Sequence, residues 1–150
     1  MSFSFVHLRV HSEYSLVDGL VKVKPLIKSV VDAGMPAVAV TDQNNMCSLV
    51  KFYRGAMGAG VKPISGVDLW VLGGEDDSQL TRMTLLSMNK EGYRNLTELI
   101  SRGYTEGQRY GKPIIRKAWL EARAAGLIAL SGAKMGDVGK ALLAGKPELA

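Results

Sequence analysis

The chain holds two histidines, His7 and His11, and both lie near its start. Side chains alternate in direction along an extended segment, so His7, Arg9 and His11 would share one face of a strand over Phe5–Val10. A turn rich in hydroxyls and carboxylates follows and includes Asp18. Imidazoles and carboxylates that converge at a strand end are typical of sites for metal ions and phosphate esters. Arg9 does not fit, because its permanent positive charge opposes a bound cation.

Three more polar groups come at or just beyond the ends of segments that we predict to be strands. These are Thr41–Gln43, which follows the apolar run Pro36–Val40, then Gly66–Asp68, and then Ser131–Gly132. Active sites of parallel α/β barrels collect at the carboxyl ends of the strands. The sequence therefore predicts that any chemistry is located at this edge.

Strand and helix signals alternate along the chain. Strands are predicted over Phe5–Val10, Pro36–Val40, Val61–Leu72, Met83–Met88 and Leu127–Leu130. Helices are predicted over Val23–Ala33, Leu49–Ala59, Glu91–Ser101, Arg116–Ala125 and Val138–Ala144, with Gly73–Ser78 as an acidic turn and Gly103–Gly111 as a loop. Repeated βα units favour an α/β fold with a parallel sheet, either open or closed into a barrel. Five strands are fewer than the roughly eight of a closed α/β barrel, so we expect the front part of a longer domain.

The composition is that of a soluble globular protein, since 47% of the residues are hydrophobic. A single cysteine, Cys47, excludes an internal disulfide and fits a reducing cytosol. No apolar run approaches the roughly 20 residues that cross a bilayer, and a signal peptide is not evident. We therefore expect a cytoplasmic protein with no membrane partner. The net charge of +5 is compatible with nucleic-acid partners, but a dense block of cations that would point to direct binding is missing.

The sequence resembles the N-terminal PHP (polymerase and histidinol phosphatase) domain of bacterial DNA polymerase III alpha subunits, in their proteobacterial form. The resemblance runs from about Phe5 to the end of the chain. Five stretches carry it: V-H-L-R-V-H-S-E-Y-S-L-V-D-G, G-M-P-A-V-A-V-T-D-Q-N-N-M, G-A-G-V-K-P-I-S-G-V-D, L-L-S-M-N-K-E-G-Y-R-N-L and L-S-G-A-K-M-G-D-V-G-K-A-L-L. It implies part of a distorted (β/α)7 TIM-like barrel whose C-terminal strands are missing from this chain. Residues 1–150 would form the N-terminal portion of that domain, and the polymerase domains would follow elsewhere.

In metal-binding members of the family, the first motif reads H-x-H, the second T-D-H and the third G-x-E, and a fourth histidine opens an H-L-T-L-L strand. Those side chains hold metal ions that hydrolyse phosphate esters. Of the corresponding positions here, His7 is kept, whereas Arg9, Gln43 and Arg82 replace histidines and Asp68 replaces the glutamate. Arginine has no lone pair to offer a metal, so the resemblance implies a degenerate site.

Asp18 is also kept, and His11 and Asp42 remain as polar neighbours in this cleft. The two arginines bring positive charge where metal ions would have been. Our hypothesis is that they act as counter-ions for Asp18, Asp42 and Asp68. No metal is expected, and any residual one would use His7, Asp18 and Asp68.

Three functions stay open at this point. The first is a catalytically inactive scaffold that stabilises a replicative DNA polymerase, a nucleotidyltransferase, and binds the separate proofreading exonuclease subunit. The second is an active metal-dependent phosphoesterase, a 3′–5′ exonuclease or a pyrophosphatase, with Zn²⁺ or Mn²⁺. The third is an α/β domain whose histidines are only structural. The resemblance implies Mg²⁺ and DNA for the full-length protein, along with other replicase subunits as partners, and predicts that this fragment alone is inactive.

Overall fold

A computed structural model describes residues 5–73, 79–109 and 111–150. The chain divides into two compact units, Met1–Val67 and Asp68–Ala150, and the long strand β2 (Lys62–Gly73) contributes to both. Most of the predicted acidic turn over Gly73–Ser78 lies outside the described residues. Among the described helices, none has the length and apolar character that spanning a membrane would require.

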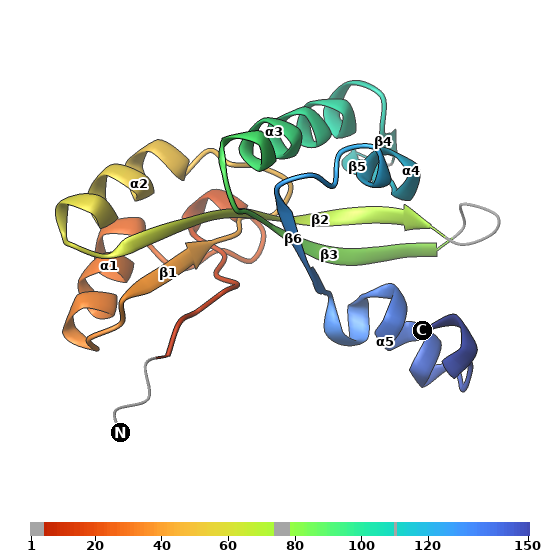
Figure 1. The fold of residues 1–150 in the computed structure, drawn as a ribbon, viewed down its shortest axis with the longest axis horizontal. Coiled ribbons are helices and arrows are strands. Elements are labelled where there is room, and N and C mark those ends of the chain that lie inside the picture. The colour runs from red at the N-terminus through yellow and green to blue at the C-terminus, as the bar shows by residue number, and fades with distance from the viewer. Residues whose placement is uncertain (1–4, 74–78, 110) are drawn as a thin grey trace. The chain divides into compact units, whose positions relative to one another are not determined.

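In the first unit, two helices and two parallel strands enclose a small apolar core (Figure 1). The elements are α1 (Val23–Asp32), β1 (Ala37–Val40), α2 (Leu49–Gly58) and the first half of β2. β1 is buried along its whole length and pairs with β2 in the register Ala37↔Lys62. α1 and α2 pack on each other. These elements match the periodicity of the sequence closely, because each has one clear apolar face or is apolar throughout.

The segment predicted as the first strand is only partly a strand. It runs beside β1 and forms one isolated parallel bridge, His7↔Val38. Thr41 then takes over the pairing, because its backbone N–H donates to Val10 O at 2.8 Å and its Oγ accepts from Val10 N at 3.1 Å. A side-chain hydrogen bond therefore replaces one of the backbone hydrogen bonds expected between two paired strands.

The second unit is a mixed sheet with one long helix packed on it. Its elements are β3 (Gln79–Ser87), α3 (Lys90–Thr105), β4 (Gln108–Arg109), β5 (Lys112–Arg116), α4 (Lys117–Glu121), β6 (Leu127–Ser131) and α5 (Asp137–Leu143). The strand order is β4-β5-β2-β3-β6. α3 packs against β3, β5 and β6.

Three predictions for this unit are wrong. The sheet is not purely parallel, because β5 runs parallel to β2 whereas β6 is antiparallel to β3 and β4 is antiparallel to β5. The segment Gly103–Gly111 is not a loop, and helix Arg116–Ala125 is much shorter than predicted. α3 continues to Thr105, a β4–β5 hairpin follows, and α4 covers only Lys117–Glu121. Proline and glycine marked turns correctly here, but a two-residue strand leaves no periodicity to detect.

The start of α3 is fixed by a cap and by a close backbone approach. The Asn89 side chain accepts a hydrogen bond from Gly92 N at 2.9 Å, as a typical N-cap does. A Cβ built on Gly92 would lie 1.8 Å from Gly126 O, so only glycine fits at this position.

Two buried carboxylates as the candidate functional site

Asp42 is the centre of a buried polar cluster in the first unit. Its side chain is 1% exposed and accepts four hydrogen bonds. Ser12 donates both its backbone N–H, at 2.6 Å, and its Oγ, at 2.8 Å, while Ser15 Oγ donates at 2.8 Å and Ser48 Oγ at 2.5 Å. Together they saturate the lone pairs of a carboxylate. We call Ser12, Ser15, Asp42 and Ser48 the serine cage.

Local chain geometry brings the members of the serine cage together. The chain leaves β1 with Thr41 and Asp42, and the short 3-10 turn Glu13–Ser15 lies over this exit. Ser15 Oγ also accepts from Gln43 N at 3.1 Å, and Asn45 Nδ2 donates to Tyr14 O at 3.0 Å. The cage therefore fastens the turn to the loop after β1.

An ion pair at the surface adds to this fastening. Lys51 Nζ, on α2, donates to Glu13 Oε1 at 3.1 Å and lies 3.5 Å from Tyr14 Oη. The hydrogen bond to Glu13 raises the pKa of Lys51 above its usual 10.5. Exposed pairs of this kind contribute little to stability, so the buried cage dominates.

His11 and Asp18 form a second, more exposed contact in the first unit. Both carboxylate oxygens of Asp18 lie 2.9 Å from His11 Nδ1, which donates to them. The His11 side chain is 10% exposed and that of Asp18 is 42% exposed. His7 and Arg9 are exposed, and the ring of His7 meets Phe5 edge to face, with centroids 4.8 Å apart.

Asp68 is the buried carboxylate of the second unit, and its partner is a guanidinium. It is 1% exposed, and Arg82 Nη2 lies 3.2 Å from its Oδ2. Thr84 Oγ donates to Asp68 Oδ1 at 3.2 Å. The Arg82 guanidinium also stacks over the Trp70 ring, 4.9 Å from its centroid. Asp68 lies in the interior of β2 rather than at a strand end, contrary to the prediction.

The residues of the predicted metal site do not fit a bound metal cluster. A metal ligand must offer lone pairs to the ion, but those of Asp42 already accept from three hydroxyls and one N–H. Asp68 is held by a cation, and Asp18 faces an imidazole N–H. Within residues 5–73, 79–109 and 111–150, groups of three or more His, Cys, Asp or Glu side chains suited to holding a metal ion are not found.

The structure thus divides the predicted site residues into distinct environments. The counter-ion hypothesis describes Asp68, which Arg82 pairs, but it is wrong for Asp42 and Asp18, whose partners are hydroxyls and His11. Gln43 takes part through its backbone N–H and O. Sequence reasoning missed Ser48, Thr84 and Trp70 as partners of the buried charges. A buried carboxylate demands several donors, but no sequence rule says which distant hydroxyls supply them.

The α/β arrangement agrees with the family that the sequence resembles. The PHP domain family matches residues 7–150, and the chain therefore belongs to this family. The family prediction made from the sequence is confirmed.

The relatives found are named DNA polymerase III subunit alpha. The chain is 65% identical over 146 residues to DNA polymerase III subunit alpha of Pseudomonas aeruginosa, covering 97% of this chain and 12% of that protein. It is 52% identical over 145 residues to DNA polymerase III subunit alpha of Escherichia coli K12, covering 97% of this chain and 12% of that protein. The chain thus spans 12% of the length of these relatives.

One solved structure supports the fold alone. It is an amidohydrolase from Chromobacterium violaceum with bound sulfate and no metal, with a TM-score of 0.51 and 19% sequence identity. The match covers 64% of this chain and 32% of that one. Together with the family match, this likeness confirms the predicted fold class, an α/β fold that forms part of a TIM-like PHP barrel.

Proposed function

We propose that this chain is the N-terminal part of the PHP domain of a DNA polymerase III alpha subunit, the catalytic chain of a bacterial replicase. In this proposal, the PHP segment is a catalytically degenerate scaffold, and DNA synthesis with Mg²⁺ belongs to polymerase domains outside these 150 residues. The high identity to alpha subunits over nearly the whole chain supports the assignment.

The Asp68–Arg82 pair is the observation that carries the degenerate-site part of the proposal. A guanidinium 3.2 Å from Asp68 supplies the positive charge that a metal ion would otherwise supply. Because arginine stays protonated and offers no lone pair, it neutralises the carboxylate without activating water. The serine cage acts similarly on Asp42 by donating hydrogen bonds that need no metal.

The proposed partners are the other subunits of the replicase. A PHP domain without hydrolytic activity needs proofreading to be carried out elsewhere, so we propose that the separate exonuclease subunit docks on it. The replicase acts on DNA in the cytoplasm. The domain would need Zn²⁺ or Mn²⁺ only if its PHP site were catalytically active.

The test is metal content and phosphoesterase turnover on the full-length protein, purified without chelator. The proposal predicts substoichiometric Zn²⁺ and Mn²⁺ by mass spectrometry and no release of phosphate from nucleotide substrates above that of an Arg82→Ala, Asp68→Ala control. Stoichiometric metal with turnover that the control loses would instead establish an active phosphoesterase. Primer extension with Mg²⁺ on the same preparation tests the polymerase assignment separately.

A further inference from the structure

We infer that the β4–β5 hairpin of the second unit carries a binding site for the phosphate backbone of double-stranded DNA. We define the basic patch as Arg109, Lys112 and Arg116. The inference rests on the proposed function, because it names the ligand that the domain would meet in a replicase.

The hairpin places the three cations of the basic patch on one face. Arg109 and Lys112 are directly opposite each other in the antiparallel pair, so their side chains project to the same side. Lys112, Ile114 and Arg116 alternate along β5 and share that side. All three cations are exposed, whereas Ile114 between them is buried. The patch is therefore a cationic surface on an apolar base.

The basic patch keeps an excess of positive charge among the described residues, although the Glu106 carboxylate attracts Arg116. In the described part of the second unit, ion pairs join Arg82 to Asp68, Arg102 to Glu106, Lys117 to Asp137 and Arg123 to Glu98, and they leave out Arg109, Lys112 and Arg116. Glu106 is the nearby acid, and two contacts of Arg102 with its carboxylate, at 3.0 and 3.3 Å, already engage it. Like charges directly opposite each other on paired strands destabilise the pairing. A bound anion would remove that repulsion.

A hollow beside the basic patch is lined in part by two of the patch's own arginines. A cavity of about 280 Å³ is lined by the apolar side chains of Leu72 and Ile114, by Glu106 and by Arg109 and Arg116. Both arginines therefore border one concave surface. A polyanion lying across it would contact two guanidinium groups that recognise phosphate oxygens well.

The neighbouring aromatic rings favour phosphate recognition over base stacking. Lys112 Nζ lies 5.5 Å from the centroid of Trp70, and Trp119 is flanked by Arg102 at 4.2 Å and Arg116 at 5.7 Å. Because these rings already have cations over them, they are less available to stack on unpaired bases. The patch therefore matches a duplex, which offers phosphates with its bases already stacked.

The length of the patch also fits a DNA strand. Lys112 and Arg116 are four residues apart in an extended strand, a span of roughly 13 Å. Along one strand of a duplex, successive phosphates advance by ~3.4 Å along the helix axis, so a patch of this length can reach more than one phosphate of the same strand. Contacts of this kind position a protein on DNA without reading its sequence.

The test is the salt dependence of DNA binding by the full-length protein. Fluorescence anisotropy with a labelled primer–template duplex compares the wild type with the Arg109→Gln, Lys112→Gln, Arg116→Gln variant. Each lost phosphate contact lowers the slope of log K against log salt by about 0.9. We expect the slope to fall by up to ~2.7, so the affinity ratio between wild type and variant shrinks about 40-fold between about 50 and 200 mM salt.

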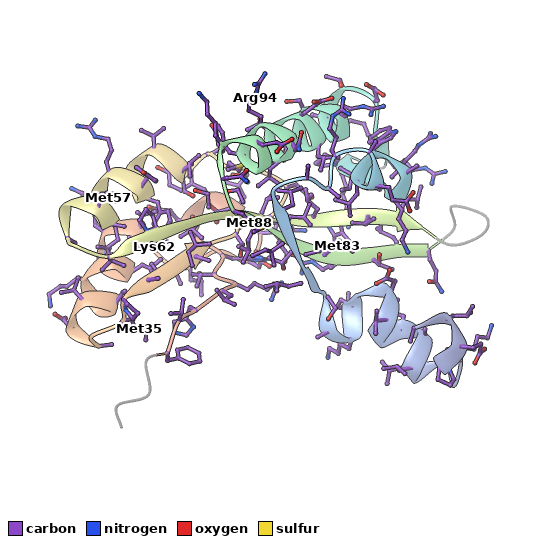
Figure 2. All side chains as sticks on the ribbon, viewed as in Figure 1. Met35, Met57, Lys62, Met83, Met88 and Arg94 are labelled. Carbon is purple, nitrogen blue, oxygen red and sulfur yellow. The ribbon has the colours of Figure 1, made fainter. Side chains whose placement is uncertain are left out.

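Two further variants separate the patch from net charge and from folding. Lys90→Gln, Arg94→Gln, Lys134→Gln removes the same charge from exposed positions elsewhere in this unit, and Arg94 points away from α3 (Figure 2). It should keep the wild-type slope. Arg109→Lys, Arg116→Lys keeps the charge and should also keep the slope.

A slope that is unchanged in the patch variant would overturn the inference, and so would an equal fall in the control. An unchanged slope would direct attention to an acidic protein partner instead. Primer extension by the wild-type protein tests the proposed polymerase function independently, so failure of the patch and failure of that function give different results.

Discussion

Two buried carboxylates, one in each unit, are stabilised in opposite ways. Asp42 and Asp68 are each 1% exposed. The partners of Asp42 are neutral, since three hydroxyls and one backbone N–H point at it. Asp68 is paired with a full positive charge, Arg82, and accepts a hydrogen bond from the Thr84 hydroxyl.

The difference shows that a buried carboxylate can be stabilised in two physical ways. A carboxylate surrounded by donors organises the chain, because its donors come from the turn at Ser12 and Ser15 and from Ser48 at the start of α2. A carboxylate paired with a guanidinium balances charge, and such pairs are often replaceable by apolar residues of similar size. The serine cage should therefore be intolerant of substitution, whereas the Asp68–Arg82 pair should tolerate replacement of both partners together.

Removal of Asp42 should have the largest effect on stability. Asp42→Ala leaves three buried hydroxyls and the Ser12 N–H without their acceptor, and we expect a loss of about 3–5 kcal/mol in the free energy of unfolding. Urea denaturation of the full-length protein, followed by a domain-specific probe, measures it. Asp32→Ala, which removes an exposed carboxylate paired with Lys28, is the control and should change stability by less than about 0.5 kcal/mol.

The second-largest effect on stability is expected for the Asp68–Arg82 pair. Arg82→Met removes the guanidinium that pairs with the buried Asp68, and we expect a loss of about 2–3 kcal/mol, less than for a fully buried pair because the Arg82 side chain is 15% exposed. The double variant Asp68→Asn, Arg82→Met should recover most of this loss in the same assay. A double variant as unstable as the single one would remove the distinction between the two carboxylates.

Truncation of one donor of the serine cage should have a smaller effect. Ser48→Ala deletes the Oγ that donates to Asp42 Oδ2, and a hydrogen bond to a carboxylate contributes about 1–2 kcal/mol. In the double variant Ser48→Ala, Asp42→Ala the loss should be close to that of Asp42→Ala alone. Additive losses would mean that Ser48 acts on something other than Asp42.

The smallest effect concerns an exposed pair in the second unit. The side-chain hydrogen bond from Arg102 lowers the pKa of Glu106 below its usual 4.5. A lowered pKa stabilises the fold above the unfolded value, and that contribution is lost as the pH falls through the folded value. Thermal unfolding of wild type and Glu106→Gln should therefore differ slightly near pH 7 and converge once the pH falls below the lowered pKa of Glu106. A difference that persists in acid would show that the pair acts through packing.

The sequence predicted the secondary structure well where one segment carries its own signal. α1, β1 and α2 were expected within a residue or two, because apolar spacing, the buried run after Pro36 and the stops at Gly34 and Gly60 are all local. Motif comparison also identified the family and pointed to Asp42 and Asp68 as residues of interest. It did not distinguish the environments of the two residues.

The tertiary structure decided the features that depend on contacts between distant segments. Ser12 and Asp42 are 30 residues apart, yet their hydrogen bond defines the serine cage. The direction of β6 depends on its pairing with β3, and the apolar run Leu127–Leu130 would look the same in a parallel or an antiparallel sheet. Local patterns fix which residues avoid water, whereas partners of buried charges and strand directions follow only from how segments far apart in the chain meet.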